Sequence, residues 1–196
     1  MRTSFILASH SPRRRELLAA AGFEFETLSA GVVEKFDAHL TLREMTLFNA
    51  LRKGACAARL HPESVVLAAD TLVALDGEVI GKPSDSKHAA QILQRLSGRT
   101  HEVCSAVFIS HLAAARSTCF HEISRVRFRR LSRKEIDNYF AKVNPLDKAG
   151  AYGAQGHGAE IIARIDGSFT NVVGLPMEKT IRALRKFGIE PRATPN

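Results

Sequence analysis

Hydroxyl residues and arginines are concentrated in one short segment near the N-terminus. Residues 9–15 read Ser-His-Ser-Pro-Arg-Arg-Arg, and they follow a short apolar run, 4–8, that predicts a buried strand. Ser11 is the expected N-cap of a helix that begins at Pro12. Arginine is unfavourable at a helix N-terminus, so three of them in the first turn indicate a site for a polyphosphate, bound by guanidinium and free backbone N–H groups. The alternative is a solvated basic turn.

An aspartate follows the most apolar run of the chain. Residues 65–69 read Val-Val-Leu-Ala-Ala, and we predict that Asp70 ends this buried strand. A carboxylate buried without a partner is costly, so Asp70 must be hydrogen-bonded, paired or metal-bound. We interpret it as a metal ligand or a general base, and a strand-end aspartate that caps a turn is the alternative.

Three more charged residues gain a role if the fold brings them beside Asp70. Lys82 stands between a glycine and a proline in a predicted hairpin, on an arm short enough to reach a phosphate. Glu34 lies in a predicted loop, 29–37, and Lys53 lies in a predicted helix. Without such a fold, each is an ordinary solvent-facing residue.

Composition and charge limit the classes of ligand. The chain has 196 residues, 45% of them hydrophobic, and a net charge of +8, which suits a phosphate-rich small molecule. Nucleic acid is the alternative ligand class. We do not expect it to bind, because tryptophan is absent and no Lys/Arg run exceeds three residues. The three cysteines form no C-x-x-C pair, which fits a reducing cytoplasm. No apolar run approaches the roughly 20 residues of a membrane span, and no membrane association is expected.

Strand and helix patterns alternate at both ends of the chain, whereas the middle predicts antiparallel strands. The expected strands are 4–8, 23–28, 64–75, 78–80, 101–110, 116–130 and 160–165, and the expected helices are 12–21, 41–60, 85–96, 132–143 and 177–187. We therefore predict an α/β fold in a single domain, with a mixed, partly antiparallel sheet flanked by helices and two lobes around a phosphate-binding cleft. The domain is expected to cover 1–191, with a flexible tail at 192–196.

Five sequence blocks, in this order, resemble the Maf family of nucleoside triphosphate pyrophosphatases, also called septum formation inhibitor proteins. The blocks are Leu-Ala-Ser-His-Ser-Pro-Arg-Arg at 7–14, Ala-Asp-Thr at 69–71 with Gly-Lys-Pro at 81–83, Leu-Ser-Gly-Arg-Thr-His at 96–101, Asp-Lys-Ala-Gly-Ala-Tyr-Gly-Ala-Gln-Gly at 147–156, and Val-Gly-Leu-Pro at 173–176. Together they cover nearly the whole chain.

The resemblance implies cleavage of a nucleoside triphosphate between its α and β phosphates, giving the monophosphate and pyrophosphate. It also implies a divalent metal, Mg²⁺ or Mn²⁺, a homodimer, and a role in nucleotide-pool sanitation with a possible link to arrest of cell division. Phosphoanhydride cleavage needs charge neutralisation and a positioned water more than covalent help, which agrees with the residues described above.

The resemblance also assigns roles to individual positions. Asp70 matches the proton acceptor for the attacking water, with Glu34, Lys53 and Lys82 as the other charged catalytic residues, and Asp70 and Glu34 would hold the metal. The positions matched to the remaining roles are Ser9, Arg13 and Arg14 for phosphate binding, Arg13, Thr71 and Gln155 for substrate specificity, and Asp147 and Lys148 for the polar lining of the cleft.

Within the family, Asp70 followed by Thr71, with the Ala-Tyr-Gly-x-Gln-Gly loop, resembles the branch that acts on dTTP and UTP. The branch that acts on 7-methyl-GTP usually has Asp-Gln at the first place, and it is the first alternative. Two positions depart from the family pattern: Val32 and Val33 occupy a loop that usually carries another acidic residue, and His10 replaces a small residue. A non-enzymatic division inhibitor that binds nucleic acid or protein is the second alternative.

Overall fold

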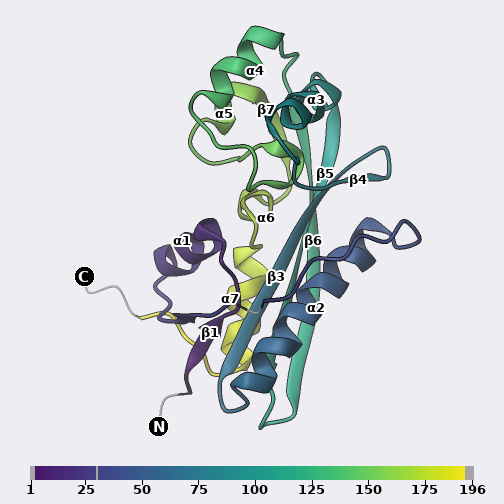
Figure 1. Ribbon diagram of the computed structural model, residues 1–196. Helices are drawn as coiled ribbons and strands as arrows, with labels where there is room; N and C mark the ends of the chain where they lie inside the picture. The colour runs from purple at the N-terminus through teal and green to yellow at the C-terminus, as the bar shows by residue number, and fades with distance from the viewer. Residues whose placement is uncertain (1–2, 30, 193–196) are drawn as a thin grey trace.

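A computed structural model describes residues 3–29 and 31–192 as a mixed sheet with helices on both faces (Figure 1). The elements in chain order are β1 (Phe5–Leu7), α1 (Pro12–Ala20), β2 (Glu26–Thr27), α2 (Leu42–Leu60), β3 (Val65–Leu75), β4 (Glu78–Ile80), α3 (Ser86–Leu96), β5 (Thr100–His111), β6 (Arg116–Phe128), α4 (Arg133–Phe140), the 3-10 turn η1 (Ala149–Ala151), α5 (Gly158–Ile161), β7 (Ile162–Asp166), α6 (Phe169–Val173) and α7 (Met177–Lys186).

The sheet confirms the predicted α/β class and its mixed character. Its strand order is β2-β1-β3-β5-β6-β7, with β4 paired to β3. The two pairings of β1 are parallel, and all other pairings between the described strands are antiparallel. One edge of β3 pairs with β5 from Val65 to Ala74, whereas its other edge pairs with β1 only at Val65–Leu67 and with β4 only at Val73–Leu75. The stretch 68–72 of β3 therefore has an open edge.

Local sequence signals account for several element boundaries. The Ser11 side chain accepts a hydrogen bond from the Arg14 backbone N–H, which caps α1 with Pro12 in its first turn, as predicted. Thr41 and Glu44 form a reciprocal capping box at the start of α2. Asp76 and Gly77, with φ angles of 53° and 83°, form the tight hairpin turn between β3 and β4.

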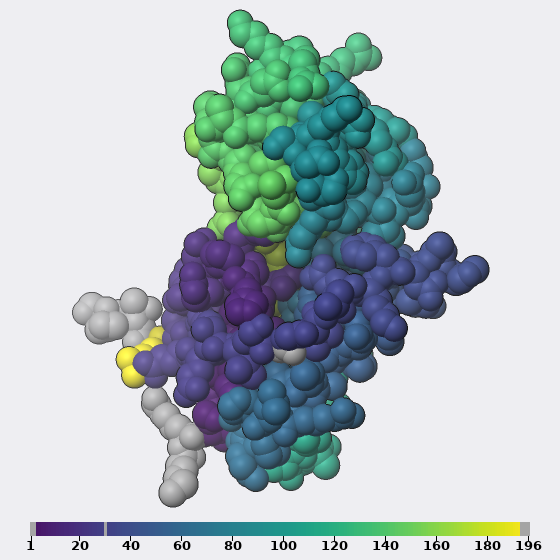
Figure 2. Space-filling model, in the orientation of Figure 1, coloured from purple at the N-terminus to yellow at the C-terminus, as the bar shows by residue number. Residues whose placement is uncertain are grey.

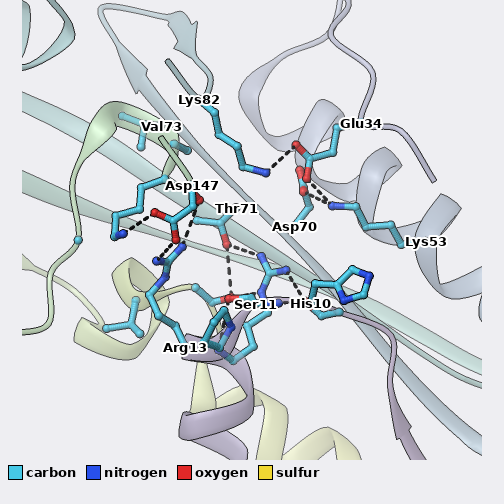
Figure 3. Close-up of a pocket in the computed structure, with 18 of the residues that line it drawn as sticks. His10, Ser11, Arg13, Glu34, Lys53, Asp70, Thr71, Val73, Lys82 and Asp147 are labelled. Carbon is cyan, nitrogen blue, oxygen red and sulfur yellow. Dashed lines mark hydrogen bonds and ion pairs between the residues drawn. The ribbon is translucent and has the colours of Figure 1, made fainter. Parts of the chain in front are cut away.

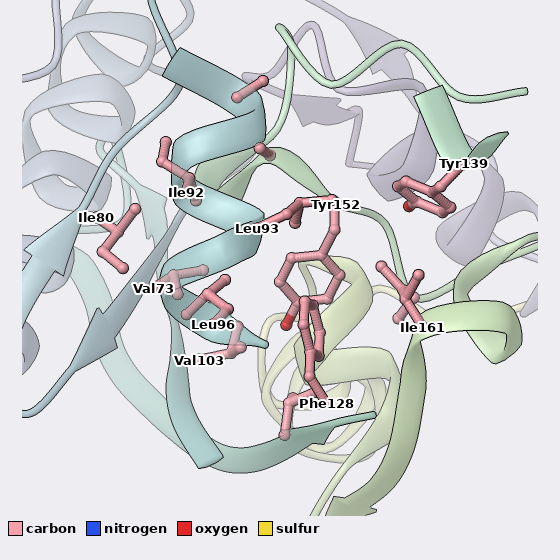
Figure 4. Close-up of a cluster of buried hydrophobic side chains, with 14 of the residues drawn as sticks. Val73, Ile80, Ile92, Leu93, Leu96, Val103, Phe128, Tyr139, Tyr152 and Ile161 are labelled. Atoms are coloured by element: carbon pink, nitrogen blue, oxygen red, sulfur yellow. The ribbon is translucent and has the colours of Figure 1, made fainter. Parts of the chain in front are cut away.

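Two lobes share this sheet (Figure 1). In the upper lobe, α3, α4 and the ends of β5 and β6 enclose an apolar cluster that includes Phe128 and Tyr139 (Figure 4). In the lower lobe, one apolar cluster joins α1 and α7 to one face of the sheet, and a smaller cluster joins α2 to the other. The surface is hollowed between the green and teal upper part and the purple lower part (Figure 2). The predicted two-lobed arrangement is therefore confirmed.

Some predicted elements differ from the structure. The strand expected over 64–75 is confirmed as β3, but Asp70 lies in its middle, paired with Ala106, and does not end it. The strand expected over 23–28 shortens to the two residues of β2, which pair with β1 alone and are exposed. The segment 158–161 is a helical turn before β7, and the short helix α6 was not predicted. Short elements of this kind carry too few residues to show a periodicity.

The C-terminal end of the described chain is bonded to the segment that follows α1. Of the tail predicted at 192–196, residues 193–196 lie outside the described residues, whereas the Arg192 backbone N–H donates to the Gly22 carbonyl over 2.8 Å. Arg192 also forms an ion pair with Glu24.

None of the helices within 3–29 and 31–192 has the length and apolar character needed to cross a membrane.

A glycine sets the distance between α2 and the sheet. A Cβ placed on Gly54 would overlap the Cδ1 atom of Phe108 and lie 3.2 Å from the Cβ of Ala68. We predict that Gly54→Ala lowers the free energy of unfolding by about 1 kcal/mol, because overpacking costs about 1–3 kcal/mol and outweighs a helix-propensity gain of about 1 kcal/mol. Urea denaturation measures this change. In a Phe108→Ala background the cost should shrink or reverse sign, and a gain in stability in the natural background would contradict the prediction.

A buried histidine makes the stability of the upper lobe depend on pH. The His101 ring is 2% exposed, packs edge-on against Phe128, and its Nε2 lies 2.7 Å from the Tyr152 hydroxyl. Burial lowers the pKa of His101 to about 4. Between pH 6.5 and 4 the unfolded chain therefore binds a proton that the folded chain does not, and stability must fall as the pH is lowered.

We predict that the free energy of unfolding falls by about 3 kcal/mol between pH 7.5 and pH 4 through His101 alone, since one pKa unit corresponds to about 1.4 kcal/mol. The variant His101→Gln retains a group that bonds the Tyr152 hydroxyl but does not titrate. Urea denaturation at several pH values should give a shallower pH dependence for this variant. Identical slopes for the two proteins would contradict the prediction.

Candidate active site

A cavity of about 530 Å³ lies between the lobes, within the usual range for small-molecule sites. It opens where the edge of β3 is unpaired. The turn that precedes α1, the loop before α2, Lys82 after β4, the loop around η1 and the end of α6 supply the other walls. Of the residues predicted for the site, those that line this cavity are Ser9, Arg13, Arg14, Glu34, Lys53, Asp70, Thr71, Lys82, Asp147 and Lys148.

Two carboxylates meet at one lysine in this cavity. Nζ of Lys53 donates to Oε1 of Glu34 and to Oδ1 of Asp70, each over 2.7 Å (Figure 3). Lys53 lies on the face of α2 that packs on the sheet, Asp70 lies on β3, and Glu34 comes from the loop before α2. Nζ of Lys82 lies 3.6 Å from Oε2 of Glu34. The structure therefore brings together the four predicted catalytic residues.

Asp70 is the most deeply buried member of this group, with 2% of the residue exposed. Burial raises the pKa of its carboxyl above the usual range, because desolvation outweighs the opposing attraction of Lys53. Within the described part of the chain, its Oδ2 atom is buried and has no hydrogen-bond partner. Asp70 therefore lines the cavity with one oxygen that no described group pairs and with a raised proton affinity, which suit a general base.

Glu34 behaves differently, although it shares Lys53 with Asp70. Burial pushes the pKa of Glu34 upward, but the hydrogen bond and charge of Lys53, helped by Lys82, hold this pKa below its usual range. Two carboxyl groups in one cavity therefore have pKa values shifted in opposite directions. Glu34 keeps its charge and Asp70 accepts a proton more readily, which separates an electrostatic role from a proton-accepting role.

The carboxylate pair also bears on metal binding. The described residues contain no group of three or more His, Cys, Asp or Glu side chains arranged to hold a metal. However, Mg²⁺ is usually bound by one or two carboxylates together with water and substrate phosphate oxygens. Glu34 and Asp70 bring two carboxylates to the same cavity, which meets that requirement. The residues present fit a divalent cation that shares its ligands with a bound phosphate.

Arg14 has a structural position that the sequence did not indicate. Its guanidinium group donates to the Ser9 hydroxyl, the Ala69 carbonyl, the Thr71 hydroxyl and the Gly174 carbonyl, over 2.9–3.2 Å. The Ala69 carbonyl belongs to the open edge of β3, so Arg14 replaces a missing strand partner there. Acceptors within the described residues thus use four of its five N–H groups, which leaves one for a ligand.

A second charged group lies at the rim of the cavity. Nη1 of Arg13 donates to Oδ2 of Asp147 over 3.1 Å, and Nζ of Lys148 donates to Oδ1 of the same carboxylate over 2.5 Å (Figure 3). Because α1 belongs to the lower lobe and Asp147 to the upper one, this ion pair joins the lobes. The two cations also hold the pKa of Asp147 below its usual range, against the effect of burial.

The predicted specificity residues are only partly brought together. Thr71 lines the cavity, and its hydroxyl bonds to Arg14. Gln155 is not among the described residues that line the cavity, although its neighbours Gly153 and Ala154 are. The sequence did not indicate Tyr152, nor the end of α6 at Val172–Gly174, as parts of the wall. Their apolar character is typical of a core and carried no chemical signal.

Comparisons with known proteins show the family of this chain. The family model described as "Maf-like protein" matches residues 4–187. The chain belongs to the Maf family. A "dTTP/UTP pyrophosphatase" of Bacillus pumilus is 46% identical over 186 residues, covering 95% of this chain and 97% of that protein. A protein of the same name in Bacillus velezensis is 43% identical over 190 residues, covering 97% and 100% of the two chains. The resemblance read from the five sequence blocks is therefore confirmed.

Solved structures show that the Maf fold is shared more widely. A HAM1 protein from Coxiella burnetii matches with a TM-score of 0.51 at 12% identity, covering 94% of this chain and all of that one. The Ham1 protein of Staphylococcus aureus matches with a TM-score of 0.50 at 15% identity, covering 94% and 97%. At these identities the likeness shows a common fold alone.

The hydrogen bonds of Arg14 predict a large effect of a conservative substitution. Arg14→Lys should lower the free energy of unfolding by about 2–4 kcal/mol, because an ammonium group cannot reach all four acceptors and leaves buried carbonyl groups unpaired. Arg15→Lys, at an exposed position of the same helix, is the matched control and should change stability by less than about 0.5 kcal/mol. Equal effects of the two substitutions in urea denaturation would contradict the role given to Arg14.

Proposed function

We propose that this protein is a metal-dependent nucleoside triphosphate pyrophosphatase that converts dTTP and UTP to the monophosphate and pyrophosphate. The observation that carries the proposal is the Glu34–Lys53–Asp70 group at the end of a cation-lined cavity large enough for a nucleotide. The names of the Bacillus relatives support this reaction and these substrates. Clearing unwanted pyrimidine nucleotides from the cellular pool is the corresponding role.

The cations of the cavity suit a triphosphate. Arg13, Lys82 and Lys148 line the cavity, and Arg14 keeps one free N–H group. Ser9 adds a hydroxyl beside the N-terminus of α1, where backbone N–H groups favour an anion. A triphosphate carries about four negative charges near neutral pH, and preorganised cations around it stabilise charge that develops during cleavage.

In the proposed reaction Asp70 accepts the proton of the attacking water at Oδ2, while Lys53 holds Oδ1 and fixes the carboxylate plane. The raised pKa of Asp70 makes it a stronger base than an exposed aspartate. Glu34 and Asp70 would hold Mg²⁺ or Mn²⁺ when it is bound, and the cation would neutralise charge on the phosphate oxygens. Thr71, Arg13 and Gln155 are proposed to select the base.

The domain extent, the oligomeric state and the cellular location belong to the same proposal. We infer a single domain over 1–191, a homodimer and a cytoplasmic location. The continuous course of β5 and β6 through both lobes supports one domain. Family membership supports the other two.

A nucleotide panel tests the reaction. With Mg²⁺ or Mn²⁺, the protein should release pyrophosphate from dTTP and UTP, and not from ATP. Release of orthophosphate, or no turnover with either metal, would contradict the proposed reaction. Release of pyrophosphate from 7-methyl-GTP alone would keep the reaction and contradict the proposed substrate class.

Asp70→Asn tests the proton acceptor. This nearly isosteric change should lower kcat about 10²–10⁴-fold, because an amide cannot accept the proton. Asp76→Asn, in the exposed hairpin at the end of the same strand, is the matched control and should keep full activity. In the unmodified protein kcat should fall as the pH is lowered through the raised pKa of Asp70, since only the ionised carboxylate is a base. Full activity of Asp70→Asn would contradict this role.

A further inference from the structure

A chain of buried polar side chains runs from the cavity into the sheet. The Thr71 hydroxyl lies 2.9 Å from the hydroxyl of Ser105, its direct partner across β3 and β5. The Ser105 hydroxyl in turn donates to the Asn171 backbone carbonyl over 2.8 Å. Both Ser105 and Asn171 are 0% exposed. Neither residue has a part in the proposed reaction. The presence of polar rather than apolar side chains at two fully buried positions behind Thr71 therefore needs an explanation.

The side chain of Asn171 holds α6 in place on the sheet. Its Oδ1 accepts the Ser105 backbone N–H over 3.1 Å, and its Nδ2 donates to the Val103 carbonyl and to the Ser124 hydroxyl over 3.0 and 2.9 Å. These partners determine the orientation of the amide. A flipped amide would place its NH2 group against the Ser105 N–H donor and its oxygen against the Val103 carbonyl oxygen. The Asn171 carbonyl is therefore held at a fixed distance from the Ser105 hydroxyl.

This arrangement determines where the Thr71 hydroxyl hydrogen points. Nη2 of Arg14 donates to the Thr71 oxygen over 2.9 Å, so the hydrogen cannot point toward Arg14. The Ser105 hydrogen is used for the Asn171 carbonyl, which leaves the Ser105 oxygen free to accept from Thr71. The Gly174 carbonyl, 3.3 Å away, is a second acceptor on the protein side. The Thr71 hydrogen therefore points into the protein.

We propose that Ser105 and Asn171 are positioning residues that make Thr71 a pure hydrogen-bond acceptor toward the cavity. One lone pair of the Thr71 oxygen takes the Arg14 N–H (Figure 3). Because Thr71 lines the cavity, the other lone pair remains for a ligand. The ligand must then present an N–H group at this point. The imide N3–H of uracil or thymine meets this requirement, whereas the bare N3 of cytosine would place lone pair against lone pair. The inference rests on the proposed nucleotide substrate and specifies how the base is read.

Binding of uncleavable analogues tests the proposal independently of turnover. We would measure the Kd of α,β-methylene UTP and α,β-methylene CTP, with Mg²⁺, by titration calorimetry. These two ligands share the phosphate chain, and their bases have the same ring size. The unmodified protein should bind the UTP analogue at least about tenfold more tightly, because a site built to pair with an N–H group rejects a base that lacks it.

Three variants assign the preference to individual groups. Ser105→Ala removes the nearer inward acceptor, so the Thr71 hydrogen becomes available to cytosine N3, and the UTP/CTP preference should fall about fivefold. Thr71→Val removes the hydroxyl and should bring the ratio of the two Kd values close to one, whereas Thr71→Ser should keep the preference. Ser110→Ala, another buried serine of β5, is the matched control and should leave the ratio unchanged.

Each contrary result has a definite meaning. Equal Kd values in the unmodified protein, or no binding of either analogue, would overturn the proposal. A preference that survives Thr71→Val would show that another group reads the base, and one that survives Ser105→Ala would show that Ser105 has only a structural role. If Ser105→Ala does not fold, the pair Thr71→Val and Thr71→Ser still decides whether the hydroxyl reads the base. Failure to release pyrophosphate from UTP, with the binding preference intact, would overturn the proposed reaction alone.

Discussion

An unpaired strand edge in the middle of a protein is the constraint on which the rest of this structure depends. Between its short pairings with β1 and β4, β3 presents peptide groups over 68–72 that none of the strands described here covers on that edge. Buried peptide groups need partners, so side chains and ligands must take the place of a strand. Arg14 does so at the Ala69 carbonyl. The cavity therefore lies at the only stretch of this edge that the described strands leave open.

The alternation of side chains along β3 gives the cavity its two chemical sides. Successive residues of a strand point to opposite faces, so Asp70 turns toward Lys53 on α2 and Thr71 turns toward Arg14 on α1. One side holds the paired carboxylates, and the other holds the hydrogen bonds that the Arg14 guanidinium group donates to hydroxyl and carbonyl oxygens. A strand buried on both faces can place two such different groups next to each other at little cost in space, and each is partnered by a different layer of the fold.

Local sequence signals predicted much of the fold. Ser11 with Pro12 placed the start of α1, and the Asp76–Gly77 pair placed the hairpin, because each acts within a few residues. Glu34, Lys53, Asp70 and Lys82 were singled out by residue type and position and given roles by family resemblance, but only the fold shows that they lie together. The internal bonds of Arg14, and the alignment of Ser105 with Thr71, depend on strand register and on contacts between residues far apart in sequence. No local pattern carries that information.

The two long strands that serve both lobes also restrict how the molecule can move. β5 and β6 are hydrogen-bonded to each other from Thr100–Arg127 to His111–Arg116, without a break at the boundary between the lobes. A hinge between rigid bodies needs a few residues that change their backbone angles freely, and a continuous ladder does not supply them. Opening and closing of the cavity must therefore come from twisting of this ribbon or from movement of the loops that line the cavity. We therefore expect the width of the cavity to change little when a ligand binds, so that ligand size is selected by a preformed site.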